Sequence, residues 1–313
     1  MREADDFSFY PPDWSLQPPP TTGQRNDVYK ATVVPLAERV AADALEQAGR
    51  SPGEVTHVVV ASCTGFFAPG LDIELVKRLG LPPTTRRVLI GFMGCYAAFN
   101  ALRVADGFCN SEEDAVVLVV CAELCTLHFQ VNDSMEQAVV NSLFADGCAA
   151  AVVSNRRAPG TLAYVDNHVL LDDDSMEDMS WAVGDTGYTM GLTSRVPKVI
   201  ARHLPAYLES LLGRESLTQE DVGWWAIHPG GRAIVEKAQQ VLGLPDDAVA
   251  DSFAVLRDYG NMSSPTILFV LKRFLEKHQA ALQESEPGLG HGVAMAFGPG
   301  LTLEGALWKG VEA

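Results

Sequence analysis

The sequence contains few basic residues for its length. Its 313 residues include 23 Lys and Arg against 40 Asp and Glu, which gives a formal net charge of −17. A field of that sign repels phosphate backbones, so a nucleic-acid partner is not expected. A small anionic ligand remains compatible with this charge, because it needs only a local basic or helix-N-terminal site.

Long apolar runs are missing as well. The longest, residues 115–122, has the length of a strand and is far short of the roughly 18 residues that a membrane-spanning helix needs. Residues 1–9 lack the apolar stretch of a signal peptide. The six cysteines are scattered, and several lie inside apolar runs, which suits a reducing compartment better than a disulfide framework. We therefore expect a cytoplasmic protein without membrane insertion.

The first 24 residues show no hydrophobic period. They contain Tyr10-Pro11-Pro12 and a run of three prolines at 18–20, and are predicted to form an irregular arm. Regular structure is predicted to begin near Asp27, where apolar residues recur at helical spacing.

After the arm, apolar strands alternate with helices. Strands are predicted over 56–62, 87–92 and 115–121, and helices over 71–79 and 95–108. Strands that are apolar on both faces and separated by helices favour a parallel or mixed sheet covered on both sides. The sequence therefore predicts an α/β fold.

A weak internal repeat relates two halves of the chain. Three features of the first half, Glu54-Val55, the segment 79–82 (LGLP) and Gly94-Cys95, recur in the same order about 165 residues later. The repeat indicates a duplicated half-domain. We divide the chain into the arm 1–24, a first half 25–156 and a second half 157–313. The second half is predicted to contain strands over 224–227 and 252–256 and a helix over 265–278.

Cys95 is the best candidate for a nucleophile. It follows the predicted strand and a Met93-Gly94 turn, and it is expected to open a helix. Unpaired N–H groups and the positive end of the helix dipole would lower the pKa of the thiol there and leave its sulfur exposed at a cleft. A buried structural cysteine is the alternative, because free cysteines are often buried.

Two polar residues of the second half fall at corresponding places. His228 lies between the aromatic strand and a Pro-Gly-Gly turn, at the sheet edge where α/β proteins bind ligands, although it could equally be a structural histidine. Asn261 could be a turn or capping residue ahead of Ser264 and Pro265. The repeat brings both to the side of Cys95. There a thiol and an imidazole can form an ion pair, and imidazole and amide donors can stabilise an oxyanion.

Four motifs together resemble the signatures of type III polyketide synthases, the chalcone and stilbene synthase family. They are 91–98 (GFMGCYAA), 227–231 (IHPGG), 260–264 (GNMSS) and 297–300 (FGPG), in the right order and spacing, and the match runs from about Arg25 to the C-terminus. The resemblance implies a thiolase-like fold, with two pseudo-repeated halves in a layered αβαβα arrangement, and a homodimer.

The resemblance also implies a reaction. Cys95 would accept a starter acyl group from acyl-CoA or an acyl carrier protein. His228 and Asn261 would hold the carbonyl of the malonyl-CoA thioester during its decarboxylation, and the enolate would attack the acyl-cysteine in a Claisen condensation. Repeated cycles and ring closure would give an alkylpyrone, a resorcinol or a related product. CoA thioesters are the substrates, and no metal or redox cofactor is implied.

Further residues are placed by the resemblance in the substrate pocket. Phe144 matches the gatekeeping phenylalanine of the family. At three pocket positions, Cys63, Cys125 and His128, the plant enzymes usually have small hydroxyl residues, so this chain resembles bacterial members instead. The remaining pocket residues are Thr64, Met179, Tyr188, Ser263, Gly298 and Pro299.

The resemblance leaves one unit of the family unmatched. The strand–helix–strand unit that opens the family's first half, with a central strand and basic residues for the CoA phosphates, has no counterpart before Arg25. We therefore expect an unpaired sheet edge in the first half.

Two weaker sequence patterns are not assigned to a ligand site. The sequence Cys121-x3-Cys125-x2-His128 has metal-like composition but no clear fourth ligand, and no metal is predicted. The acidic residues 172–174, 177 and 178 are predicted to form a solvated loop.

Two other functions remain open at this point. The initiating ketoacyl-acyl carrier protein synthase shares the fold and the Cys, His and Asn, but its histidine and asparagine motifs differ from those found here. A catalytically impaired, ligand-binding homologue is the alternative from another class. Several condensations with ring closure, as opposed to one, would separate the main interpretation from the first rival.

Overall fold

The computed structural model describes residues 9–11, 16–132 and 134–312. Its first half forms a four-stranded sheet in the order β2-β1-β3-β4. β1 pairs in parallel with β2 and β3, whereas β4 is antiparallel to β3. β1 and β3 are buried along their whole length, which explains why they are continuous apolar runs. The elements are α1 (Thr22–Gln47), β1 (His57–Ser62), α2 (Leu71–Arg78), β2 (Arg86–Gly91), α3 (Ala97–Ser111), β3 (Val116–Leu124), α4 (Met135–Leu143) and β4 (Asp146–Ser154).

The second half forms another four-stranded sheet, in the order β5-β10-β9-β8, and a separate hairpin of β6 and β7. β8 and β9 are parallel, and β10 is antiparallel to both of its neighbours. The elements are β5 (Leu162–Leu171), β6 (Met179–Gly184), β7 (Gly187–Leu192), α5 (Val196–Gly213), β8 (Val222–Ile227), α6 (Arg232–Leu242), α7 (Ala250–Tyr259), α8 (Ser264–Gln283), β9 (His291–Gly298) and β10 (Thr302–Gly310).

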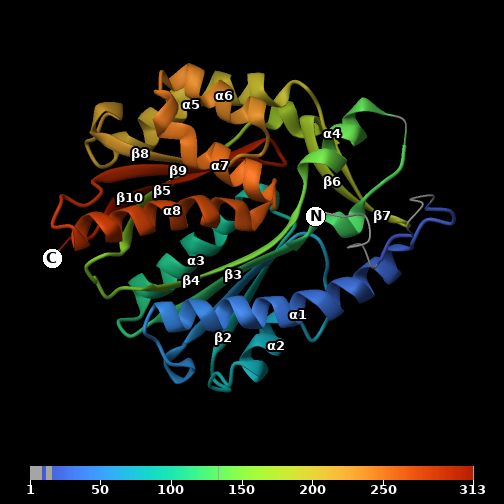
Figure 1. The fold of residues 1–313 in the computed structure, drawn as a ribbon, viewed down its shortest axis with the longest axis horizontal. Helices are drawn as coiled ribbons and strands as arrows, with labels where there is room; N and C mark the ends of the chain where they lie inside the picture. Colours follow the sequence, from blue (N-terminus) through green and yellow to red (C-terminus); the bar gives the residue numbers. More distant parts are fainter. Residues whose placement is uncertain (1–8, 12–15, 133, 313) are drawn as a thin grey trace.

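The two sheets are stacked with helices between and outside them (Figure 1). From the bottom of the view to the top, the layers are α1 with α2, the first sheet, α3 with α8, the second sheet, and α5 with α6. Each junction of layers has its own hydrophobic core: α1 and α2 pack on the first sheet, α3 and α8 fill the space between the sheets, and α5 and α6 pack on the second sheet. The predicted αβαβα arrangement of two halves is confirmed.

Three strands of each half correspond, and the halves differ at both sheet edges, since β2 lies outside β1 but no strand of the described ranges lies outside β8. The parallel pair β1 and β3 corresponds to β8 and β9, and the antiparallel β4 corresponds to β10. β10 carries β5 on its outer side, but within the described ranges no strand pairs with the outer side of β4. The expected unpaired edge of the first half is confirmed. The expectation of a missing central strand is wrong, because the open position lies at the edge.

Three local predictions are corrected. Residues 252–256 belong to the helix α7, not to a strand, because Ser252 and Val255 are both fully buried at helical spacing on one face. α1 begins at Thr22, earlier than predicted, because Thr21 and Gln24 form a capping box. Cys95 lies in a 3₁₀ turn, Gly94–Tyr96, that precedes α3.

The acidic segment 172–178 is not a solvated loop throughout. Asp172 and Asp178 are buried, and their carboxylates accept hydrogen bonds from Ser175 Oγ at 2.8 Å and Thr193 Oγ1 at 2.6 Å. Local donors thus compensate for the burial of these charges. No helix of the described part of the chain is long and apolar enough to cross a membrane.

Candidate active site

Cys95, His228 and Asn261 lie at the ends of three elements and are all buried. The sulfur of Cys95 lies 3.9 Å from both the Oδ1 and the Nδ2 atoms of Asn261. The amide is fixed in this place, since Nδ2 donates to the carbonyl of Gly230 at 3.2 Å and Oδ1 accepts from the N–H of Ser263 at 2.9 Å. The Asn261 side-chain amide therefore connects the turn that carries Cys95 with the loop that follows His228.

The turn that carries Cys95 leaves no room for a side chain at Gly94 or at the facing Gly298. Gly94 has φ +72°, and a Cβ there would lie 2.5 Å from Cδ of Pro299. A Cβ at Gly298 would lie 2.6 Å from the ring of Tyr96. The Tyr96 hydroxyl donates to the Pro299 carbonyl at 3.2 Å. Gly298 and Pro299 thus pack against the turn that carries Cys95.

The thiol of Cys95 differs from its prediction. Burial raises its pKa to about 11, although hydrogen bonds from Ser263 and Asn261 act in the opposite direction. The side chain is only 4% exposed. The loss of hydration raises the pKa of the thiol by more than the hydrogen bonds and the turn geometry lower it. The expected lowering of the pKa and exposure of the sulfur are therefore wrong for the protein without substrate.

His228 is a fully buried imidazole. Neither of its ring nitrogens has a hydrogen-bond partner within the described ranges. Burial lowers the pKa of the ring to about 3, so it is neutral and can donate one N–H. The backbone N–H of His228 donates to the Met295 carbonyl at 2.8 Å, which fixes the loop to β9. Buried polar groups without partners are rare and costly, so this pair of nitrogens indicates a ligand site.

Phe144 is joined to the site through the backbone. It follows α4, and it forms an isolated parallel bridge with Asn261. The N–H of Asn261 donates to the Leu143 carbonyl, and the N–H of Ala145 donates to the Asn261 carbonyl, both at 2.9 Å. The structure therefore places Phe144 next to Asn261, which in turn contacts Cys95.

A buried carboxylate lies beneath the site. Glu123 near the end of β3 accepts hydrogen bonds from Ser264 Oγ at 2.7 Å, Thr64 Oγ1 at 2.8 Å and the N–H of Cys63 at 2.9 Å. Burial raises its pKa to about 7. Sequence reasoning missed this residue. A single acidic residue directly after the apolar run 115–122 was the signal that could have found it.

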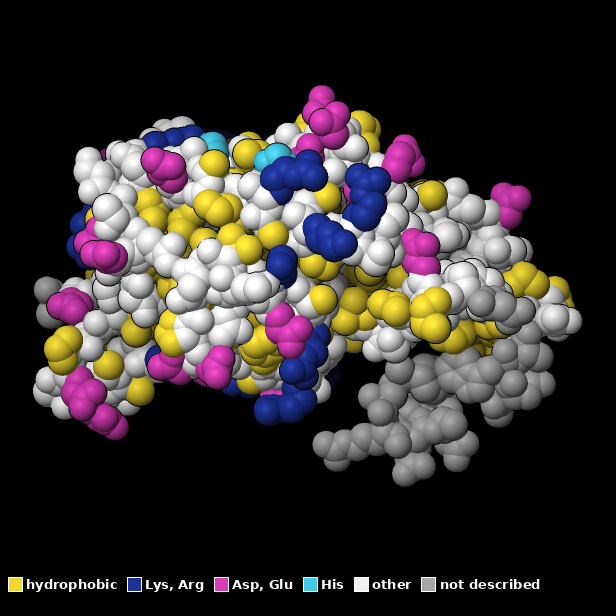
Figure 2. All heavy atoms as spheres, turned by 90° about the horizontal axis from the view of Figure 1, so that it is seen from above, with side chains coloured by type: hydrophobic (Ala, Val, Ile, Leu, Met, Phe, Trp, Pro, Cys, Tyr) yellow, Lys and Arg dark blue, Asp and Glu magenta, His cyan; other side chains and the backbone are white. Residues whose placement is uncertain are grey.

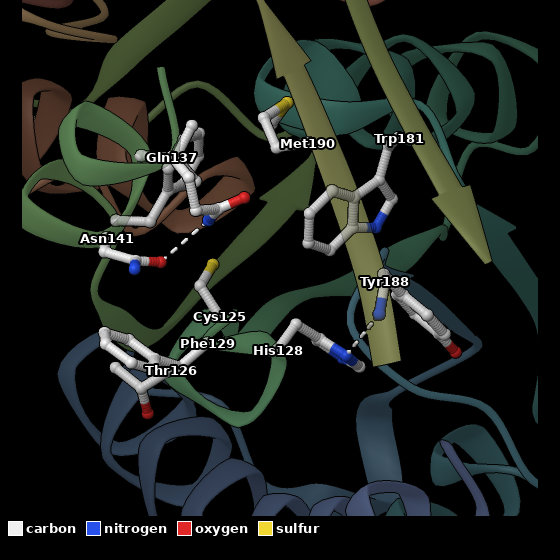
Figure 3. A pocket seen from close by; sticks show the side chains of 11 residues that line it. Cys125, Thr126, His128, Phe129, Gln137, Asn141, Trp181, Tyr188 and Met190 are labelled. Atoms are coloured by element: carbon white, nitrogen blue, oxygen red, sulfur yellow. Dashed lines mark hydrogen bonds between the residues drawn. The ribbon is translucent and has the colours of Figure 1, made fainter. Parts of the chain in front are cut away.

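A small cavity of about 30 Å³ lies beside Phe144 (Figure 3). Trp181 and Met190 project into it from the β6–β7 hairpin, and Gln137 and Asn141 face them from α4. The cavity has room for roughly one or two water molecules and no acyl chain. Its walls consist of Cys125, Thr126, His128, Phe129, Gln137, Val140, Asn141, Phe144, Trp181, Tyr188 and Met190.

Three rings form one wall of this cavity. His128 stacks on Tyr188 with centroids 3.9 Å apart, and Trp181 stands edge-on to both. His128 Nε2 lies 2.7 Å from the Thr64 carbonyl, and His128 Nδ1 accepts from the N–H of Tyr188 at 3.1 Å. Burial lowers the pKa of His128 to about 4, so the ring is neutral. The indole N–H of Trp181 donates to the Cys63 carbonyl at 2.8 Å. No sequence pattern marked Trp181.

The other predicted pocket residues lie outside this cavity. The Thr64 side chain turns to Glu123, and the Cys63 sulfur accepts from the N–H of Gly94 at 3.1 Å. Ser263 lies beside Cys95. Met179 packs in the core beneath α5. Among the described residues, no group of three His, Cys, Asp or Glu could hold a metal ion.

Comparison with known proteins covers almost the whole chain. Residues 10–156 match the profile of chalcone and stilbene synthases, N-terminal domain, and residues 166–312 match the C-terminal domain. The alpha-pyrone synthesis polyketide synthase-like Pks18 of Mycobacterium tuberculosis is 36% identical over 93% of this chain and 74% of its own length. The 3,5-dihydroxyphenylacetyl-CoA synthase of Amycolatopsis orientalis is 33% identical over 91% of this chain and 76% of its own.

A solved structure is similar over the same extent. The crystal structure of PKS-I from the brown alga Ectocarpus siliculosus superposes with a TM-score of 0.93 and 40% sequence identity, over 96% of this chain and 80% of that one.

Proposed function

This chain belongs to the chalcone and stilbene synthase family and is a type III polyketide synthase, and on that premise we propose that Cys95, His228 and Asn261 catalyse its condensations. The observation that carries this assignment is the contact of the Cys95 sulfur with the Asn261 amide. The same amide donates to the Gly230 carbonyl in the loop that follows His228, whose buried ring nitrogens have no partner within the described ranges. These groups are the nucleophile and the two donors that a decarboxylative condensation requires.

The first step loads the starter. The neutral His228 takes the proton of the Cys95 thiol as the sulfur attacks the carbonyl carbon of the starter thioester. The bond from that carbon to the donor sulfur breaks, and the departing thiolate receives the proton from His228. Because burial raises the pKa of Cys95 and lowers that of His228, the uncharged pair is the resting form. A charged pair forms only with the thioester in place.

The second step uses malonyl-CoA as the extender. The Asn261 amide and the N–H of the neutral His228 donate to the thioester oxygen, where negative charge develops as the bond to the carboxylate breaks and CO₂ leaves. The enolate carbon attacks the acyl carbonyl on Cys95, and the Cys95 thiolate departs. The β-keto thioester then reloads, extends and cyclises to an alkylpyrone, a resorcinol or a related product. The chemistry needs no metal and no redox cofactor.

Phe144 is the proposed gate between the donor and the cavity. The cavity of about 30 Å³ holds no acyl chain, so side chains around Phe144 have to move when substrate enters. Cys125, His128 and Tyr188 would then face the growing chain. The starter is an acyl group from acyl-CoA or from an acyl carrier protein.

We propose a homodimer that forms through β2. This strand is an edge of the first sheet, and Leu89 on it is 52% exposed. Phe66, Phe92 and Met93 are exposed large side chains of the same region. An edge strand with apolar neighbours suits an isologous pairing with a second copy. The six cysteines are free thiols, which supports a cytoplasmic location.

One assay tests this function. The purified chain is incubated with malonyl-CoA and a panel of acyl-CoA starters, and the products are identified by mass spectrometry. Products with two or more extensions and a ring are expected, and Cys95→Ser should lose both acyl loading and product. A single linear condensation product would favour the ketoacyl synthase, and product formation by Cys95→Ser at the normal rate would reject the assignment.

A further inference from the structure

Four basic side chains lie on the outer face of the second half. Arg195, Lys198 and Arg202 follow at three- and four-residue spacing, so they share one face at the start of α5, and all three are exposed. Arg232, the first residue of α6, is 80% exposed. Lys198 and Arg202 have no acidic partner within ion-pair distance in the described part of the chain, whereas Arg195 lies 3.3 Å from Asp178. We call these four cations the basic patch.

The basic patch stands out in a chain of net charge −17. Residues 196–206 of α5 contain no Asp or Glu at all. Figure 2 looks down on the α5 and α6 side of the molecule, where Lys and Arg side chains gather near the middle of the face and acidic side chains lie mostly around them. Arg232 pairs with Glu236 at 2.7 Å and Arg195 with Asp178 at 3.3 Å, so the cations of the patch without an ion-pair partner are Lys198 and Arg202.

Helix stability does not explain these cations. A helix N-terminus carries partial positive charge, and a cation there is unfavourable by about 0.3–1 kcal/mol. α2, α4 and α7 have acidic residues in their first turns, whereas α1, α3, α5, α6 and α8 have none. In α5 and α6 the first turn carries a cation instead, Lys198 and Arg232. A residue choice that opposes local stability, made at the start of both helices, indicates a function.

The basic patch lies beside the proposed gate. β7, whose residues Tyr188 and Met190 line the cavity, leads directly into α5, and the N–H of Leu192 at its end donates to Glu136 of α4. At the other end of α4, Leu143 lies near Gly231, the residue before α6, where an added Cβ would be 3.5 Å from Leu143 Cδ2. Both helix starts therefore flank α4, and Phe144 follows α4 immediately.

We propose that the basic patch docks an acidic acyl carrier protein, whose phosphopantetheine arm presents the starter thioester to Cys95. This inference rests on the proposed function. In the transfer, the acyl bond to the carrier sulfur breaks, the acyl bond to the Cys95 sulfur forms, and the Cys95 proton passes to the carrier thiol.

The shape of the basic patch favours a protein over free CoA. Its cations spread over a convex helix surface of about 10 Å along α5, and none of them lines the cavity beside Phe144. Phosphate groups of a nucleotide are bound by donors that converge on them. The distributed carboxylates of an acidic domain instead match a distributed set of cations, and such complementarity mainly accelerates association.

The test reverses two charges and compares two donors. In the double variant Lys198→Glu/Arg202→Glu, Arg195 is kept because it pairs with the buried Asp178. The matched control is Lys272→Glu/Arg156→Glu, which changes the net charge equally at exposed sites of α8 and of residue 156. The donors are hexanoyl-CoA and a bacterial acyl carrier protein charged with a hexanoyl group. Acyl transfer to the enzyme is followed by intact-protein mass spectrometry.

The two donors should respond differently. With the hexanoyl carrier protein at low salt, the second-order rate of transfer should fall at least tenfold in the patch variant, and raising the salt should shrink this difference. With hexanoyl-CoA the change should stay below twofold, and the control should lie within twofold of the unmodified chain with both donors.

Three results would overturn the proposal. An equal fall with both donors would assign the basic patch to the CoA phosphates. An unchanged rate with the carrier protein would leave the basic patch without a role in docking, and an unmodified chain that accepts hexanoyl-CoA but not the carrier protein would exclude carrier delivery. Failure of both the acyl-CoA panel and the hexanoyl carrier protein to load Cys95 would instead reject the proposed function itself.

Discussion

The backbone of Asn261 is hydrogen-bonded to the residues on both sides of Phe144, at 2.9 Å to the Leu143 carbonyl and at 2.9 Å to the Ala145 N–H. The proposed gate and a proposed catalytic amide are therefore held together by main-chain atoms. The side chain of Phe144 takes no part in these bonds, so the gate can be altered without releasing Asn261.

This arrangement predicts the effect of Phe144→Ala. Decarboxylation of malonyl-CoA, which the proposed mechanism assigns to Asn261 and His228, should stay within about threefold of the unmodified rate, whereas removal of one oxyanion donor typically costs about 100-fold or more. The distribution of starters and chain lengths should change. Both are measured on one sample, by CO₂ release and by product mass spectrometry. An Asn261→Ala variant is the control that should lose decarboxylation, and an unchanged product distribution in Phe144→Ala would contradict the gate.

Trp181→Ala should lengthen the products. The indole occupies one side of the cavity and is held there by Tyr188, His128 and the Cys63 carbonyl. Because Trp181 is only half-buried, the loss of unfolding free energy should stay below the about 3–5 kcal/mol of a fully buried aromatic. Trp181→Phe separates ring volume from the hydrogen bond and should leave product length nearly unchanged. Equal product lengths in all three proteins would show that Trp181 does not limit the cavity.

Glu123 should make stability depend on pH. Its pKa is raised from 4.5 to about 7 in the folded chain, so between these values the folded state binds more protons than the unfolded state. Stability from this group is present at pH 4.5 and below and is lost as the pH rises through about 7, by about 3 kcal/mol at most. Denaturant unfolding at pH 5.5, 7 and 8.5 measures the loss.

Glu123→Gln is the matched variant for this measurement. Its carbonyl can accept from Cys63 and Thr64, while its amide donates to the hydroxyl of Ser264, which can accept in turn. The variant should therefore gain stability relative to the unmodified chain as the pH rises from 5.5 to 8.5. A constant difference between the two proteins over this range would mean that Glu123 keeps an ordinary pKa.

Alkylation of Cys95 tests the charge state of the resting thiol. With a pKa of about 11, the thiolate fraction is small at neutral pH, so iodoacetamide should react slowly at pH 7 and about tenfold faster for each unit up to pH 10. Peptide mapping identifies the modified residue, and Cys95→Ser corrects for the other thiols. A fast rate that does not vary between pH 6 and 9 would reveal a preformed ion pair with His228.

The strands β1, β2, β3 and β8 could be predicted because their patterns are local, whereas the three proposed catalytic positions rest on the internal repeat and the four motifs. β1 and β3 are covered on both faces, and such strands must be apolar at every residue. The segment 252–256 could not be assigned, because a short apolar run fits a strand and a buried helix equally well. Only the packing of Ser252 and Val255 on one face decides in favour of the helix.

The electrostatics of the site could not be predicted. The same glycine turn and helix start would lower the pKa of an exposed thiol, but Cys95 is covered by residues distant in sequence, such as Asn261 and Ser263. Burial of this kind is set by the docking of the two halves. Trp181 was missed for the same reason, since nothing in the hairpin sequence shows which side chains turn toward α4.

The bonds between Glu123 and Ser264 and between Leu143 and Asn261 cross from the first half of the chain to the second. Each half thus supplies groups that the other half holds in place. While the chain is being synthesised, the first half emerges with the proposed nucleophile but without the amide and the imidazole proposed to act on malonyl-CoA. On the proposed mechanism a nascent chain therefore consumes no extender, and decarboxylation begins only once both halves have folded against each other.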